Sequence, residues 1–134
     1  MKINIISFLA TIVPFIVIDA LWLTTMSKKL YAPYLSHILS DSPKLTPALL
    51  FYIIYSVGLV VFVSNPSMSQ HASTVKILLL GSFFGAVAYA TYDLTNHATL
   101  NDWPVIITLV DILWGAFATG IVSLISIHIT KYFI

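Results

Sequence analysis

The sequence contains no cysteine, no arginine and no glutamate, and charged residues make up only 8% of its 134 residues. The absence of cysteine excludes disulfide bonds, thiolate metal sites and a cysteine nucleophile. Without arginine the chain lacks the planar fork that grips phosphates, and its six lysines are scattered. With a formal net charge of only +1, we expect no nucleic-acid partner. The sequence predicts no cofactor.

Hydrophobic residues, in contrast, make up 59% of the chain. Four apolar stretches are long enough for a helix to cross the hydrocarbon core of a bilayer, which takes roughly 20 residues. These stretches are residues 3–26, 46–64, 75–97 and 104–128. The sequence therefore predicts an all-α integral membrane four-helix bundle, with residues 1–134 forming a single domain. We expect the first stretch to be retained, because it is longer than the apolar region of a secretory signal and contains Asp19.

Proline and polar residues mark the expected helix ends. Thr46-Pro47 resembles a helix start, and Asn65-Pro66 predicts the end of the second span. The first loop, residues 27–45, is the only sizeable segment outside the spans. Its apolar and aromatic residues recur at helical spacing, which predicts a short interfacial helix beginning near Pro33. This helix is either an ordered connection at the headgroups or a lid over a site below it.

The lysines do not decide the orientation of the chain in the membrane. We name the side that holds the N-terminus the N-side and the opposite side the far side. Each side has three lysines: Lys2, Lys76 and Lys131 on the N-side, and Lys28, Lys29 and Lys44 on the far side. The free α-amino group favours a cytoplasmic N-terminus, so we expect a multi-pass membrane protein whose far side faces outward.

Three of the five aspartates fall within spans. Asp19 lies about seven residues before the end of the first span, Asp93 near the end of the third, and Asp111 about seven residues after the start of the fourth. Because neighbouring spans run antiparallel, all three of these ends are on the far side. At a rise of 1.5 Å per residue, the carboxyl groups share one leaflet, about 10 Å inside.

The helical faces place the same residues toward the interior. Small and polar residues of the third span lie on one half of its circumference: Gly81, Ser82, Gly85, Tyr89, Tyr92, Asp93 and Asn96. Thr108, Asp111, Gly115, Ala118 and Thr119 do the same on the fourth, and Tyr52, Tyr55 and Ser56 lie near the far-side end of the second. Gly81-x-x-x-Gly85 predicts close helix packing.

An aspartate at a helix centre costs roughly 2.5 to 3.5 kcal/mol on insertion, so the three carboxyls need partners. No lysine lies at their depth. The available neutral donors are Tyr52, Tyr55, Tyr89, Tyr92, Asn96, Trp22, Trp114 and His97. Burial and neighbouring like charges both favour a neutral carboxyl, so we expect at least one aspartate to be protonated at neutral pH, unless a cation or amine is bound.

Asp93 and His97 are one helical turn apart, a spacing that suits zinc or iron ligands together with Asp19 and Asp111. One histidine with carboxylates from separate helices falls short of a metal motif, so Asp93 and His97 are only weak candidates. An interfacial histidine is the alternative.

Several strings resemble a bacterial four-helix membrane family, the domain of unknown function 2177. They are Asp19 to Leu23, Phe51-Tyr52 with Tyr55, Ala88 to Asn96, and Trp103-Pro104 running to Asp111 with Trp114-Gly115. The resemblance covers nearly the whole chain and implies an inner-membrane protein without an established activity. Where this chain has His97, the family pattern usually has an aliphatic residue, which argues against a metal site.

Asp19-x-Leu21-Trp22 and Asp111-x-Leu113-Trp114 repeat one short pattern. A duplication of two halves would relate the first span to the third, whereas these two spans run antiparallel. We therefore attribute the match to convergence or chance.

The leading hypothesis is a pocket that binds, or helps to modify, a lipid headgroup or small cationic molecule. Its expected residues are Asp19, Trp22, Tyr52, Tyr55, Tyr89, Tyr92, Asp93, Asn96, Asp111 and Trp114. In an enzyme, Asp93, Asp111 or Asp19 would be the acid or base, with Tyr89 or Tyr92 positioning the substrate. The alternatives are a proton- or cation-coupled transporter, which would act as a homodimer joined through the glycine face, and a structural protein whose aspartates hold the helices together.

Overall fold

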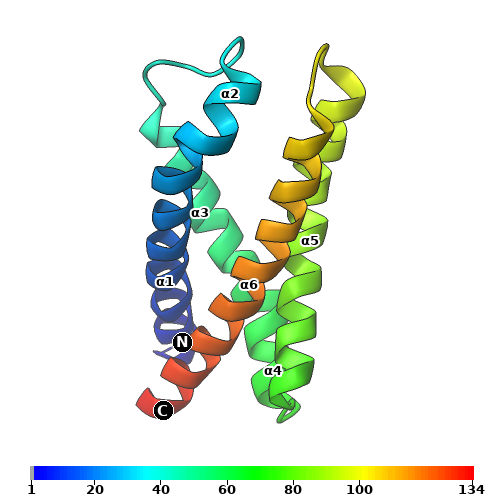
Figure 1. Ribbon diagram of the computed structural model, residues 1–134. Helices are drawn as coiled ribbons and strands as arrows, with labels where there is room; N and C mark the ends of the chain where they lie inside the picture. The colour runs from blue at the N-terminus through cyan, green and yellow to red at the C-terminus, as the bar shows by residue number, and fades with distance from the viewer. Residues whose placement is uncertain (1) are drawn as a thin grey trace.

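The computed structural model describes residues 2–134, which form four long helices and no strand (Figure 1). The first comprises α1 (Lys2–Met26), η1 (Ser27–Tyr31) and α2 (Ala32–Leu35), and the second α3 (Leu45–Leu59), η2 (Val60–Ser64) and α4 (Asn65–Ser69). The third and fourth are α5 (Thr74–Thr99) and α6 (Val105–Phe133). All four are long and apolar enough to cross a membrane. The predicted all-α, four-span architecture is confirmed.

The helices expose their most apolar side chains and bury many polar ones. Leu21, Phe62, Phe83 and Leu113 are each at least 65% exposed. Serines and threonines, in contrast, are fully buried along α1 and α6. In water this arrangement would be unstable, whereas in a bilayer the exposed side chains contact lipid tails and the polar groups bond to one another. The chain is a multi-pass membrane protein.

Two π-helical segments continue their helices at positions where the sequence predicts that the helices end. The prediction that Asn65-Pro66 ends the second span is wrong, because η2 carries the helix on through α4 to Ser69. In the same way η1 continues the first helix to Leu35, so the predicted loop of residues 27–45 shortens to residues 36–44. Each π segment is followed by a short α-helix with proline at its second residue, Pro33 or Pro66. A wider turn accommodates the proline ring, which would clash with the i−4 carbonyl in a regular α-helix.

The other helix ends lie close to the predicted ones. α3 begins at Leu45, just before Thr46-Pro47. The hydroxyl group of Ser73 accepts a hydrogen bond from the Lys76 backbone N–H (3.3 Å) and caps the start of α5. The short helix expected near Pro33 is α2, although it is joined to α1 through η1 and not through a loop.

α5 and α6 pack against each other more extensively than any other pair of helices. A Cβ atom on Gly85 would collide with the Gly115 carbonyl oxygen, and one on Gly81 with the Ser123 side chain. The predicted close packing at Gly81-x-x-x-Gly85 is confirmed. α6 covers this glycine face within the chain.

α1 packs on α6 through a polar seam in the N-side half. Thr11 and Ser126 share a hydrogen bond of 2.7 Å, and Thr130 donates to the Ser7 hydroxyl group at 3.2 Å. Next to the seam, α1, α3, η2 and α6 enclose an apolar core of Phe15, Tyr55, Leu59, Val63 and Val122. The N-side half is therefore held by contacts among all of the long helices.

In the far-side half the helices diverge into two pairs, α1 with α3 and α5 with α6 (Figure 1). The η1–α2 segment reaches from the end of α1 to the start of α6. There Leu35 packs against Trp103 and Ile107 in a second apolar cluster, together with Leu30 and Tyr31. This segment joins the two pairs of helices at the far side.

Candidate functional site

The three intramembrane aspartates are all buried in the far-side half of the bundle. Their side chains are 7% exposed for Asp19, 0% for Asp93 and 8% for Asp111. They come from α1, α5 and α6, so three helices turn a carboxyl group toward the interior. This agrees with the faces predicted from the helical periodicity.

Asp19 accepts hydrogen bonds at both carboxyl oxygens. The Tyr52 hydroxyl group of α3 donates to Oδ2 at 2.5 Å, and the Trp114 indole N–H of α6 donates to Oδ1 at 3.2 Å. Two other helices therefore hold this one carboxyl group.

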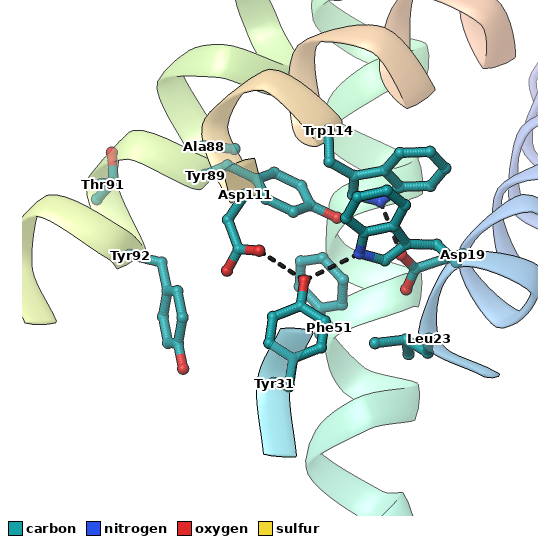
Figure 2. A pocket seen from close by; sticks show the side chains of 11 residues that line it. Asp19, Leu23, Tyr31, Phe51, Ala88, Tyr89, Thr91, Tyr92, Asp111 and Trp114 are labelled. Carbon is teal, nitrogen blue, oxygen red and sulfur yellow. Dashed lines mark hydrogen bonds between the residues drawn. The ribbon is translucent and has the colours of Figure 1, made fainter. Parts of the chain in front are cut away.

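Asp111 is reached by a chain of two hydrogen bonds that starts on α1. The Trp22 indole N–H donates to the Tyr31 hydroxyl oxygen at 2.9 Å, and this hydroxyl group donates to Asp111 Oδ1 at 2.5 Å. Figure 2 shows Tyr31 between the two groups. Tyr31 thus ties η1 to both α1 and α6.

The repeated Asp-x-Leu-Trp pattern brings the two aspartates and the two tryptophans together in a crossed arrangement. Trp114 bonds to Asp19 directly, and Trp22 bonds to Asp111 through Tyr31. The two indole rings stack with centroids 4.2 Å apart and an interplanar angle of 9°. Because α1 and α6 run antiparallel, the same spacing on each helix places its tryptophan level with the aspartate of the other.

Asp93 differs from the other two aspartates in its surroundings. The packing of α5 on α6 sets Tyr89 against Gly115 and His97 against Thr108, and this register places Asp93 opposite Asp111. Neither of its oxygens, however, receives a hydrogen bond from a donor among residues 2–134. Asp93 is thus a fully buried carboxyl group whose neighbour is a second carboxyl group.

A cavity of about 550 Å³ lies between the two pairs of helices at this level. Figure 2 shows aromatic rings and carboxyl groups around it. Its lining residues are Asp19, Trp22, Leu23, Tyr31, Phe51, Ala88, Tyr89, Thr91, Tyr92, Asp111 and Trp114. Asp19 and Asp111 supply its charged groups, and none of the described lining residues is basic. The cavity is therefore both acidic and aromatic.

Six of the ten residues predicted for a pocket line this cavity: Asp19, Trp22, Tyr89, Tyr92, Asp111 and Trp114. Tyr52 lies behind Asp19, and Tyr55 bonds to Thr119 (2.6 Å) in the core below. Asp93 is fully buried, and neither it nor Asn96 is in the lining set. Tyr92, expected to face inward, is 61% exposed and stands at the rim.

The sequence did not single out five lining residues, namely Leu23, Tyr31, Phe51, Ala88 and Thr91. Tyr31 is the most consequential of them, because it alone bonds to Asp111 across the cavity. Tyr31 belongs to the helical pattern of the first loop, but that pattern gives no indication that the segment approaches α6.

The two weak candidates for metal ligands, Asp93 and His97, lie beside different residues. Asp93 faces Asp111, whereas His97 Nδ1 lies 3.4 Å from the Thr108 hydroxyl oxygen. Within residues 2–134, no group of three or more acidic, histidine or cysteine side chains is arranged to hold a metal ion.

The chain matches a known family over the same four helices. A family model described as a predicted membrane protein, DUF2177, matches residues 4–128. The chain belongs to the DUF2177 family. The match covers the far-side ends of all four helices, and therefore the whole DUF2177 cavity described above. No curated protein and no solved structure was found to match the chain.

Proposed function

We propose that the cavity binds the cationic group of a small amphiphilic molecule or of a lipid headgroup. The observation that carries the proposal is the composition of the cavity wall. Asp19 and Asp111 face a space of about 550 Å³ that six aromatic side chains enclose and no described basic residue lines. A cation would relieve the uncompensated carboxyl groups, whereas an anion would be repelled.

The aromatic walls favour an organic ammonium group over a bare metal ion. A cation over the face of tryptophan or tyrosine gains about 0.5 to 2 kcal/mol, depending on its desolvation. Trp22, Trp114 and Tyr89 supply such faces. Among residues 2–134 the Tyr89 hydroxyl group makes no hydrogen bond, whereas the hydroxyl groups of Tyr31 and Tyr52 each do. It is free to bond to a ligand.

The rim of the cavity supports entry from the bilayer. Leu23, Phe51 and Tyr92 line the cavity and are also more than 40% exposed on the surface that faces lipid. α3 and α5 make little contact with each other in this half of the bundle. An amphiphile could place its ammonium group near Asp111 and leave its apolar tail between these helices.

Packing in the N-side half favours binding over transport. Phe15, Tyr55 and Leu59 fill the space directly below the cavity, and the α5–α6 glycines leave no gap there. A transporter would need this packed half to open. A binding role, alone or beside an enzyme, requires no such movement.

The test is binding of decyltrimethylammonium to the purified protein in nanodiscs, followed by tryptophan fluorescence. We expect saturable binding to the wild type and a roughly tenfold or greater loss of affinity in Asp19→Asn, which corresponds to about 1.4 kcal/mol. Asp41→Asn, in the exposed first loop, is the matched control and should bind normally. Equal binding of the uncharged analogue with carbon in place of nitrogen would contradict the proposal.

We further infer that the protein resides in a cytoplasmic membrane with its N-terminus inside the cell. The start of α1 and the C-terminus share one side of the bundle, and the cavity lies toward the other (Figure 1). In this orientation the cavity draws its ligand from the outer leaflet.

A further inference from the structure

Asp93 is a buried carboxyl group whose lack of a hydrogen-bond donor is not explained by the cavity. Both of its oxygens are buried and lack a donor among the described residues, and the register of α5 on α6 places it opposite Asp111. Two adjacent ionised carboxylates in a low-dielectric interior repel each other strongly. A proton held between them would remove the repulsion and supply the missing hydrogen bond at once.

The described residues around the pair include no lysine and no arginine. From η1, Tyr31 donates its phenolic hydrogen to Asp111. From α1, Asp19 adds a further negative charge on the opposite wall. On α5 itself, Tyr89 is neutral and His97 lies beside Thr108. All six lysines are exposed.

We propose that Asp93 and Asp111 share one proton, and that a cation entering the cavity displaces it. This proposal rests on the cation-binding function proposed above. It specifies which positive charge balances the two carboxyl groups when the site is empty and when it is occupied. Asp111 lines the cavity, so a bound ammonium group would lie beside the pair and take over the role of the proton. Asp93 is not among the residues that line the cavity, and it holds the second negative charge.

The exchange balances in charge and in protons. Before binding, the pair holds one proton and carries one negative charge. After binding, both carboxyls are ionised, the ligand supplies one positive charge, and one proton has left to the bulk solvent. The charge of the occupied and the empty site is therefore the same, and binding should weaken as the pH falls.

The first test measures proton release when decyltrimethylammonium binds. This quaternary probe has no proton of its own to lose. In weakly buffered solution with a pH indicator, the wild type should release about one proton per bound cation. Asp93→Asn should still bind but release none, because the amide N–H replaces the shared proton. Asp41→Asn should behave as the wild type. Binding without proton release by the wild type would overturn the proposal while leaving cation binding intact.

The second test needs no ligand. The infrared spectrum of the empty wild-type protein should contain a protonated-carboxyl C=O stretch. This band should be lost in Asp93→Asn and also in Asp111→Asn, and it should persist in Asp19→Asn. Circular dichroism checks that each variant folds. Because two variants are measured, the test remains decisive if one of them misfolds. A band that persists in both Asp93→Asn and Asp111→Asn would overturn the shared proton, whether or not any cation binds.

Discussion

The hydroxyl group of Tyr31 takes part in two hydrogen bonds, accepting from the Trp22 indole and donating to the Asp111 carboxyl group. One of its partners is on α1 and the other on α6. Removing the oxygen atom would leave a donor and an acceptor unsatisfied in a partly buried site, and an unsatisfied buried polar group costs about 1 to 3 kcal/mol.

We therefore predict that Tyr31→Phe lowers the free energy of unfolding by about 1 to 3 kcal/mol, measured from the midpoint of detergent-induced unfolding. Tyr34→Phe is the matched control, because Tyr34 lies in the same segment but is exposed and makes no hydrogen bond within residues 2–134. It should change stability by less than about 0.5 kcal/mol. Equal effects of the two substitutions would contradict the role assigned to the Tyr31 hydroxyl group.

Sequence periodicity could not have placed Tyr31 in the site. Nine residues separate it from Trp22, and at 3.6 residues per turn this is about half a circumference, so a regular helix would point the two side chains in opposite directions. The π-helical turn of η1 changes the register and directs Tyr31 toward α6. Asp93 and Asp111, in contrast, lie on regular α-helix, and both are buried as their predicted faces indicate.

At the scale of the elements, the contact between α5 and α6 depends on the absence of side chains. A Cβ atom on Gly85 would meet the backbone of Gly115, which cannot move aside without separating the helices. At Gly58 of α3, a Cβ atom would instead lie 3.1 Å from Cζ of Phe84, the end of a side chain that can rotate.

Gly85→Ala should therefore destabilise the protein by about 1 to 3 kcal/mol through overpacking. Gly58→Ala is the matched control and should be nearly neutral, because a better helix propensity of about 1 kcal/mol offsets the mild contact. The measurement is the unfolding midpoint followed by circular dichroism in detergent. A greater loss in Gly58→Ala than in Gly85→Ala would show that the α5–α6 contact is not the limiting one.

The predicted helix ends failed where a proline follows a π-helical segment. Asn65-Pro66 predicts a helix end because a proline ring clashes with the carbonyl four residues earlier in an α-helix. η2 avoids this clash with a wider turn. No local residue pattern predicts such a turn. Where no such turn intervenes, as in α5 and α6, the predicted ends were within a few residues.

At the scale of the whole molecule, the orientation is open to a direct test because the chain has no cysteine. Single cysteines at Ser42, in the α2–α3 connection, and at Ser69, at the end of α4, report on opposite sides of the bundle. We expect a membrane-impermeant maleimide to label Ser42→Cys but not Ser69→Cys in intact cells. Both should be labelled after permeabilisation, and the reverse pattern in intact cells would contradict a cytoplasmic N-terminus.

The sequence could not decide this orientation for a physical reason. Lys2, Lys76 and Lys131 balance the three lysines of the far side, so the electrostatic bias that normally orients a membrane protein is absent. The arrangement of the helices, by comparison, was predictable, because apolar length and short connections leave few ways to fold four spans.

The stacked indoles of Trp22 and Trp114 belong to different helices, and their centroids are only 4.2 Å apart. Two chromophores this close interact through their transition dipoles, so their near-ultraviolet circular dichroism depends on their mutual angle and distance. Any change in the separation of α1 and α6 at the cavity alters that signal. The near-ultraviolet circular dichroism of the protein therefore reports the opening of the cavity without an attached label.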